Sequence, residues 1–520
     1  MHLQDGRFVE TGVDVAAALQ NATELARLAR RDEALALLTH CEDWPGPLNE
    51  QGLLVRAEVL ARRDPVLALE SLAAHSEALS SPAGRFGYFV TSAFSYVNSR
   101  NFDGARDMLG SAQELVGDDL SRAARLGYER ARLQWATRQY DPDSDAIALA
   151  MSDPAPAAQF RALALRSWMH AGLEDYAAQL RDLLAAFQHF EQSPSTCDIT
   201  TAAISLHVLL RLAVELGDNG GMRAGETAYE LIEWMPDIQD LQFMSVRALA
   251  WHAFHEGDSG RAQWLFKDSK ALAPTLAWQV MAHIDRACVA RMNGNEAWAA
   301  EELALADSLA REVEWDATHG EERQALVMLA ELFASTDMAQ AQRYVSMYGK
   351  LGRDSLDPTL AAAHDRRSIA YEKYARGRVQ AVLGNVKLAK ESLEFAYDVF
   401  AQIRHPYRAA LAAAALFELT EDAQWLDKAR AQAAHFAKSP FYRRLSELDR
   451  VEEQRVLSGL TPMQRQIAIA LSQGAELDAL SQQFSRSRFT LEKQIEIIFA
   501  ALGVQSRHAL RAELRQRKML

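Results

Sequence analysis

The sequence predicts an all-α protein: a long series of helical hairpins followed by a small unit of four short helices. Three observations support this class. Ala and Leu are abundant, and the 520 residues include only 14 Pro and 26 Gly, which favours helix over strand. A turn followed by an alanine recurs through residues 1–445, and the last sixty residues contain helix-capping patterns. The length exceeds what one compact core accommodates, so we expect a solenoid joined to a separate module.

The composition is that of an ordinary globular protein, with 49% hydrophobic and 24% charged residues. Three widely separated cysteines, Cys41, Cys197 and Cys288, form no CxxC pair, so we expect reduced thiols and a cytosolic protein. The first residues lack a basic-then-apolar signal pattern. No uninterrupted apolar run reaches about 18 residues, so no membrane span is predicted and we expect a cytoplasmic location.

The charge is distributed unevenly along the chain. The net charge is −14, but residues 458–520 hold nine Lys and Arg against five Asp and Glu. The remaining residues carry 47 basic and 65 acidic side chains. An acidic body with a basic end suggests that this end is adapted to a polyanion. The alternative is that a difference of this size is ordinary scatter.

The repeat signal is a turn residue (Gly, Asn, Asp or Arg) with an alanine about five residues later, at the start of the second helix of a pair. The small alanine allows two antiparallel helices to approach closely, and the glycine before it allows a left-handed helix end. Most spacings between these alanines are 34–42 residues. The clearest copies contain Ala262, Ala299 and Ala389, and weaker copies contain Ala34, Ala68, Ala105, Ala146, Ala177, Ala224, Ala341 and Ala429.

This pattern resembles divergent tetratricopeptide repeats, whose units are helical hairpins of about 34 residues. Phe266, Ala271 and Pro274, which follow Ala262, resemble the second helix of that repeat and its terminating proline. The resemblance implies ten or eleven hairpins over residues 1–445, stacked into a right-handed superhelical solenoid. Its concave surface would bind an unknown small ligand, peptide or protein. Tryptophans such as Trp135, Trp168, Trp251, Trp264, Trp278 and Trp298 either line that groove or fill the core between repeats.

No catalytic motif is present. The sequence has no GxxxxGK[ST], GxSxG or HExxH, so we expect neither an enzyme nor a bound cofactor. His252 and His255 share one helix face and so have a possible zinc spacing, but they lie at the end of a repeat helix. We therefore interpret them as packing and surface histidines and predict no metal site.

The C-terminal segment has capping residues at the expected positions for four helices. Thr461 and Gln464 form a capping box around Pro462, so the first helix runs to about residue 472 and stops at Gly474. A second helix covers about 476–484. Ser487 caps a third helix over 488–502, which Gly503 ends. Ser506 caps a fourth helix over about 507–517.

Residues 460–520 resemble, without gaps, the LuxR/NarL-type (GerE-like) helix-turn-helix DNA-binding domain, with 446–459 as a helical linker. The resemblance implies that the third helix enters the major groove of double-stranded DNA and that the fourth helix mediates a homodimer. It carries over the following DNA-binding residues: Arg486, Arg488, Thr490, Glu492, Lys493, Glu496, Arg507 and Arg511.

The segment also departs from that family. Gln464 and Gln466 replace its usual acidic residues, and Leu477 replaces the Asn that opens its second helix. Glu492 and Glu496 stand where it presents Lys or Arg to DNA. A glutamate beside phosphates is repelled, although it accepts a hydrogen bond from the cytosine amino group. Each lost basic contact also removes a counterion-release contribution to DNA affinity.

Two functions follow from these patterns. The first is a nucleoid-associated transcription regulator, similar in layout to the C-terminal half of MalT-like regulators but without their ATPase. In it, a ligand, peptide or partner bound by the solenoid would control the helix-turn-helix. The alternative is an interaction scaffold whose degenerate helix-turn-helix no longer reads DNA, as Glu492 and Glu496 suggest. A receptor for a peptide or protein in the solenoid groove is compatible with the first function.

Overall fold

The structure is a computed structural model, which describes residues 14–230, 239–318, 320–353, 366–448, 460–484 and 486–516. Within these ranges every regular element is a helix, as the composition predicts. Eleven helical hairpins form the body of the described part of the chain. Their paired helices are α1 (Val15–Arg27) and α2 (Arg31–Leu37), α3 (Pro47–Ala61) and α4 (Pro65–Ala74), α5 (Pro82–Asn98) and α6 (Phe102–Gln113), α7 (Leu120–Ala136) and α8 (Asp145–Ala150), α9 (Pro156–Gly172) and α10 (Tyr176–Gln192), α11 (Ile199–Leu216) and α12 (Asn219–Glu230), α13 (Gln239–His255) and α14 (Ser259–Leu272), α15 (Leu276–Met292) and α16 (Glu296–Ala310), α17 (Gly320–Phe333) and α18 (Met338–Arg353), α20 (Arg366–Val382) and α21 (Val386–Gln402), and α22 (Pro406–Thr420) and α23 (Ala423–Ala433).

The predicted small residues lie on the second helix of every pair. Nine of the eleven alanines are buried, and their small size allows the two helices of a hairpin to pack closely. Two positions differ from the prediction. Ala177 and Ala224 are only partly buried, and the small residue one place later in each helix, Ala178 on α10 and Gly225 on α12, is buried instead.

The turns explain why the sequence signal is strong in some repeats and weak in others. Gly257, Gly294 and Gly384 have φ of 81°, 75° and 77°, the left-handed conformation that the glycine pattern predicts. Earlier hairpins place side-chain-bearing residues in the same conformation, for example Arg100 and Arg138, each with φ of 61°. Their repeats therefore lack the glycine mark although the turn geometry is retained.

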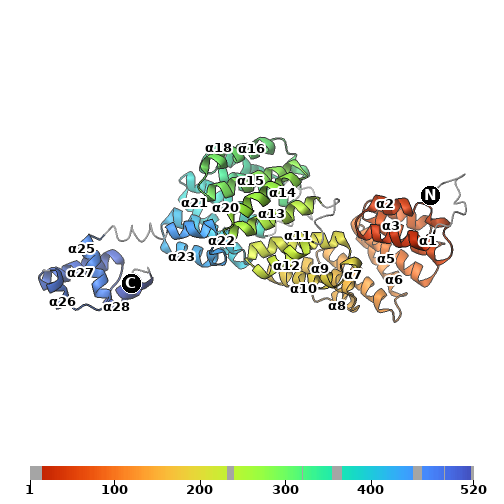
Figure 1. The fold of residues 1–520 in the computed structure, drawn as a ribbon, viewed down its shortest axis with the longest axis horizontal. Coiled ribbons are helices and arrows are strands. Elements are labelled where there is room, and N and C mark those ends of the chain that lie inside the picture. Colours follow the sequence, from red (N-terminus) through yellow and green to blue (C-terminus); the bar gives the residue numbers. More distant parts are fainter. Residues whose placement is uncertain are drawn as a thin grey trace.

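Successive hairpins stack through their first helices. Helices α1, α3, α5, α7, α9 and α11 contact one another in that order, and α15, α17, α20 and α22 continue the series. Figure 1 shows this progression from the red N-terminal hairpins to the blue α22 and α23. The first helices thus form the inner layer of the superhelix, and the second helices form its outer layer.

The first half of the superhelix closes on the start of α11. The Arg27 side chain donates to the carbonyl oxygens of Pro194 and Cys197, 167 and 170 residues away along the chain. Arg62, the C-cap residue of α3, forms an ion pair with Asp198, with 2.6 Å between Nη1 and Oδ2. The inner faces of α3, α5, α7, α9 and α11 therefore surround one space.

The second half also closes on α11, which contacts α22. Glu215 on α11 forms an ion pair with Arg367 of α20, which is 152 residues away. One hydrophobic cluster contains Ala29 and buried residues between Phe160 and Leu445, so it joins α9 and α10 of the first half to the second half. Helix α11 is thus a wall shared by both halves. It is the one described helix apolar and long enough to cross a membrane, with 56% of its length buried inside the protein. Its central position in the core accounts for that composition.

The C-terminal unit consists of α25 (Pro462–Ser472), α26 (Leu477–Phe484), α27 (Arg488–Leu502) and α28 (Arg507–Gln516). These are the four helices that the capping pattern predicts. The Thr461 capping box is formed, Ser487 accepts from the Thr490 amide, and Gly503 adopts a φ of 65°. The unit has its own core around Leu480, Leu491 and Ile498. Residues 446–448 of the predicted linker are helical, and 449–459 lie outside the described residues.

Candidate functional site: an arginine-lined cavity

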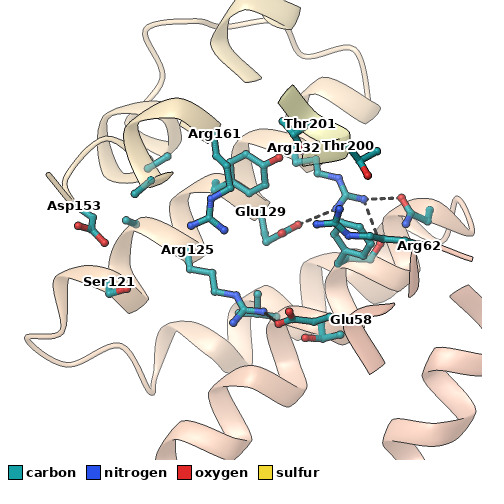
Figure 2. Close-up of a pocket in the computed structure, with 18 of the residues that line it drawn as sticks. Glu58, Arg62, Ser121, Arg125, Glu129, Arg132, Asp153, Arg161, Thr200 and Thr201 are labelled. Atoms are coloured by element: carbon teal, nitrogen blue, oxygen red, sulfur yellow. Dashed lines mark hydrogen bonds and ion pairs between the residues drawn. The ribbon is translucent and has the colours of Figure 1, made fainter. Parts of the chain in front are cut away.

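A cavity with a volume of about 560 Å³ lies inside the first half of the superhelix (Figure 2). Its walls are the inner helices α3, α5, α7, α9 and α11. Helix α7 contributes more lining residues than any other helix. These residues recur every three or four positions, the spacing that places side chains on one face of a helix. Those residues are Ser121, Ala124, Arg125, Tyr128, Glu129 and Arg132.

The lining of the cavity is rich in arginine. Arginines line it from α7 and α9, from the residue that caps the C-terminus of α3 and from the start of α2, against three carboxylates. Arg125 forms an ion pair with Glu58. The arginines are Arg31, Arg62, Arg125, Arg132 and Arg161, and the carboxylates are Glu58, Glu129 and Asp153. Figure 2 shows Arg125 of α7 extending toward Glu58 of α3, with Arg161 of α9 beside them.

Arg132 is held in place by three contacts. Its guanidinium donates to Asn98 Oδ1 at 2.7 Å, to the Phe94 carbonyl oxygen at 3.3 Å and to Glu129 Oε2 at 3.3 Å. It also lies over the Phe94 ring, 3.7 Å from the centroid. This side chain is therefore preorganised by the protein, which reduces the entropy that a ligand contact would cost.

Two arginines of the cavity have no carboxylate partner among the described residues. Arg161 on α9 lies 5.9 Å from the centroid of the Tyr128 ring, and its guanidinium makes no ion pair there. Arg31 has only a 3.5 Å contact to the Thr200 hydroxyl. Arg161 is near enough to Glu129 to oppose the rise in the pKa of that carboxyl. Neither guanidinium is fixed in an ion pair with a described residue, however, so both can face an anion.

Burial perturbs the titrating groups of the cavity. Burial raises the pKa of Glu129, against the opposing effect of Arg132, Arg125 and Arg161. Burial also raises the pKa of Tyr128, so its hydroxyl stays protonated and serves as a hydrogen-bond donor at neutral pH. The charge of Glu58 raises the pKa of Arg125 further above its ordinary value. The cations of the site are thus permanent.

The sequence-predicted DNA-binding residues lie elsewhere, on the C-terminal unit. Four of them are exposed residues of α27: Arg488, Glu492, Lys493 and Glu496. Arg488 approaches two carboxylates, Asp478 at 3.6 Å and Glu492 at 3.7 Å. The acids thus neutralise part of the positive charge that a DNA-reading helix needs.

The remaining predicted residues are dispersed. Arg507 on α28 lies 3.4 Å from Glu476, and Arg511 and Arg486 are exposed. Thr490 belongs to the N-terminal cap of α27, where its hydroxyl lies 2.8 Å from the Ser487 hydroxyl. The structure therefore brings only the α27 residues together on one face.

Some of the tryptophans line a cavity, as the groove interpretation predicts, and others do not. Trp168 lines the arginine-rich cavity, and Trp251 and Trp278 line a second, smaller one. Trp264 is 63% exposed and belongs to neither a cavity nor the core. Of the possible zinc pair, His255 is buried among the rings of Trp251, Tyr407 and Phe436. No group of three metal-ligating side chains occurs in the described ranges.

Sequence reasoning missed the arginines of the cavity. The one sequence signal that points to the cavity is the i, i+3, i+4 and i+7 spacing of Arg125, Tyr128, Glu129 and Arg132 on a single helix. The same spacing is equally typical of an ordinary helix face exposed to solvent. Only the closure of α3 and α11 around α7 turns this face into a cavity wall.

The fold and the cavity define an all-α helical-repeat protein whose inner helices enclose an arginine-lined cavity. No protein-family model matches the chain, so the resemblance of residues 460–520 to the LuxR type has no support from that source. No curated protein matches it either.

Solved helical structures are similar to the chain at low identity. One is a Rap protein complexed with competence and sporulation factor, with 11% identity and a TM-score of 0.43. The match covers 71% of this chain and 98% of that one. Another is the Naa15/Naa10 complex bound to HypK-THB, with 13% identity and a TM-score of 0.24, covering 97% and 94% of the two chains.

Proposed function

We propose that this chain is a helical-repeat interaction protein that binds an acidic segment of a partner in the arginine-lined cavity of α3–α11. The observation that carries the proposal is the set of five arginines converging on a concave space of about 560 Å³. Arginine forms paired hydrogen bonds with carboxylates, so this lining suits aspartate and glutamate side chains or a chain terminus. The proposal includes no catalytic step.

The local chemistry supports a peptide-like ligand. Arg161 on α9 offers a guanidinium that forms no ion pair with a described residue, while Tyr128 on α7 and Thr201 on α11 add hydroxyls to the lining. Phe94 and Trp168 supply apolar surface beside these groups. Most residues of this lining are polar, and its few apolar side chains suit a peptide that presents an apolar residue beside its acidic ones.

The outer face of α27 supports an interaction role for the C-terminal unit as well. Its residues include two acids and two cations, together with Phe489, 66% exposed, and Ile497, 46% exposed. Lys493 covers the Phe489 ring at 4.9 Å from its centroid. Large exposed apolar side chains between balanced charges are typical of a protein contact, whereas a DNA contact requires excess positive charge.

The test uses the full-length chain and fluorescein-labelled eight-residue peptides. One peptide pool is rich in Asp and Glu, and a matched pool replaces these residues by Asn and Gln. We expect anisotropy to detect binding of the acidic pool and weaker binding at higher salt, because exposed charge interactions are screened. Arg161→Gln should weaken binding about 10- to 100-fold, the equivalent of one charge-assisted hydrogen bond of about 1.5–3 kcal/mol.

The matched control is Arg181→Gln, which changes an exposed arginine on α10 that lies outside the cavity. This variant should bind the acidic pool as the unaltered protein does. Equal affinity for the acidic and amide pools, or an unchanged affinity in Arg161→Gln, would refute the proposal.

A second candidate function is sequence-specific DNA binding by α25–α28. It is favoured by one observation: α27 is capped at both ends as the LuxR-type resemblance predicts, and its outer face is open. This function also requires the predicted homodimer, because paired half-sites must match the geometry of a dimer.

Gel-shift titration of the full-length chain on duplex DNA across a range of salt concentrations separates the two functions. The interaction proposal predicts no shift for the unaltered chain and a large gain in non-specific affinity for the double variant Glu492→Lys, Glu496→Lys. Sequence-dependent binding by the unaltered chain would instead establish DNA binding.

A further inference from the structure

Two tryptophans continue the cavity-facing side of α7 and α9. On α7, Trp135 follows Tyr128 by seven residues and Arg132 by three, so it shares the helix face that lines the cavity. On α9, Trp168 follows Arg161 by seven residues, and both of these side chains line the cavity. The inner face of the two helices thus runs from arginine side chains to tryptophan side chains.

The two helices lie side by side in matched register. Helix α8 returns the chain between them, so α7 and α9 run in the same direction and contact each other. Arg161 lies over the Tyr128 ring, 5.9 Å from its centroid. Seven residues farther along each helix the Trp135 and Trp168 rings meet, with centroids 5.7 Å apart. These contacts mark two levels of one surface, about 10 Å apart at the helical rise of about 1.5 Å per residue.

The tryptophan pair, Trp135 and Trp168, is open on one side and anchored on the other. Trp135 is 38% exposed. Trp168 packs against a buried cluster that includes Leu165 and Met169, and this cluster holds its ring in place. The pair therefore offers a fixed aromatic surface to a ligand.

The other aromatic rings of the site are partly buried and lie beneath guanidinium groups. Arg132 is 3.7 Å from the centroid of the Phe94 ring, and Arg161 lies over Tyr128. Tryptophan is enriched among the residues that dominate the energy of protein interfaces, because it combines a large apolar area with a rigid ring. The tryptophan pair is therefore the aromatic contact point of this face.

The distance between the two levels selects a spacing in the bound peptide. A chain in the polyproline II conformation has three residues per turn and rises about 3.1 Å per residue, so side chains three positions apart point to one side about 9 Å apart. Side chains on one side of a β-strand are instead about 7 Å or about 14 Å apart, because they alternate. The polyproline II spacing is the one that matches about 10 Å between Arg161 and the tryptophan pair.

We propose that the acidic segment bound by this protein carries an aromatic residue three positions from an acidic one, and that this aromatic residue packs on the tryptophan pair. The inference rests on the proposed function, because it takes the arginine-lined cavity as the site of the acids. The acidic residue faces Arg161, and an aromatic side chain is preferred because packed rings attract each other beyond the effect of their buried area. The partner is thus recognised by two side chains at a fixed spacing as well as by charge.

The test measures the anisotropy of labelled ten-residue peptides, in a Gly and Ser background, with the full-length chain. Each peptide carries two adjacent Glu residues and one Phe, which lies one, three or six positions from the nearer Glu on either side. On one of the two sides we expect the three-position spacing to bind at least about threefold more tightly than the others, because affinity peaks when the linker matches the distance between subsites. Replacing Phe by Ala in that peptide should weaken binding about tenfold, as expected for the loss of an aromatic interface contact.

Trp135→Ala is the variant that tests the tryptophan pair, and Trp264→Ala is its matched control. Trp264 is 63% exposed and lies outside the arginine-lined cavity. In Trp135→Ala the ratio of the affinities for the Phe and Ala peptides should fall to about one, because the contact that distinguishes them is removed. The ratio should stay that of the unaltered chain in Trp264→Ala. Should Trp135→Ala fail to fold, Trp135→Leu keeps apolar volume without an aromatic ring and should lower the ratio at least about threefold.

The outcomes separate this inference from the proposed function. Equal affinity for the Phe and Ala peptides, or for all three spacings, would overturn the inference while the binding of acidic peptides still supports the proposed function. An unchanged ratio in Trp135→Ala, or an equal loss of the ratio in Trp264→Ala, would overturn the inference as well. The absence of binding by every acidic peptide would refute the proposed function and this inference with it.

Discussion

Gly127→Ala is expected to destabilise the α7–α8 hairpin although alanine is the better helix former. Gly127 is buried on α7, where a Cβ atom would lie 2.5 Å from the Ala150 amide nitrogen. It would also lie 2.8 Å from the Ala146 carbonyl oxygen and 2.8 Å from the Leu149 carbonyl carbon. All three are backbone atoms of α8, so rotation of a side chain does not relieve the clash.

The magnitude follows from two opposing effects. Replacing glycine by alanine inside a helix stabilises it by about 1 kcal/mol. Ordinary carbon contacts begin near ~3.5 Å, so α7 and α8 must separate by roughly 1 Å to accommodate the methyl group. Overpacking of this kind costs about 1–3 kcal/mol, and a clash with three backbone atoms belongs at the upper end. We expect a net loss of about 2 kcal/mol.

Gly110→Ala is the matched control. Gly110 lies within α6 and is exposed, and a methyl group at this position would have no neighbouring atom within 4 Å. That substitution should stabilise the protein by about 0.5–1 kcal/mol through helix propensity alone. Urea denaturation, together with hydrogen exchange of the α7 and α8 amides, measures both variants.

The same displacement should affect the arginine-lined cavity. Arg125, Tyr128 and Arg132 are all carried by α7, so moving this helix misplaces them. Gly127→Ala should therefore weaken binding of the acidic peptide pool, and Gly110→Ala should leave it unchanged. If Gly127→Ala is as stable as Gly110→Ala, the packing argument is wrong.

Two further predictions concern buried charge. Burial lowers the pKa of His255 and of His405 to about 3, below an unfolded value of about 6.5, so the unfolded chain binds more protons between these values. Stability is therefore fully present above pH 6.5 and is lost as the pH falls toward 3, by about 2 kcal/mol per histidine at pH 5. Urea midpoints at pH 7.5 and pH 5 should show His255→Phe losing less stability than the unaltered chain; an equal loss would contradict this. Asp285→Ala leaves Arg247 without its carboxylate and should cost about 3 kcal/mol in urea denaturation. Asp32→Ala breaks an exposed pair and should change stability by less than about 0.5 kcal/mol, so similar effects of the two variants would refute the burial argument.

Local structure was the most predictable part of this protein. The helix-breaking glycines Gly257, Gly294 and Gly384 mark turns, and the alanines after them mark tight helix contacts. At the C-terminus the Thr461 capping box and the Ser487 cap appear where the sequence places them. These features were predictable because each depends on residues only a few positions apart.

The candidate sites were less predictable. The prediction of DNA contacts on α27 rests on resemblance, and the structure adds that Arg488 lies near Asp478 and Glu492. Asp478 belongs to a different helix, so this neutralisation was not visible in the α27 sequence. The one-residue shift from Ala224 to Gly225 on α12 has the same origin, because the side chain of Leu210 on α11 fills the space beside Gly225.

The amino-acid sequence by itself determined which segments are helical, where they turn and which face of each is apolar, because helix propensity and capping act over one or two turns. Only the tertiary structure decided that Arg62 meets Asp198 and Arg367 meets Glu215 across more than a hundred residues. Those contacts depend on the small rotation between successive hairpins, summed over several repeats. That sum closes two cavities on either side of α11, a result that no short pattern contains.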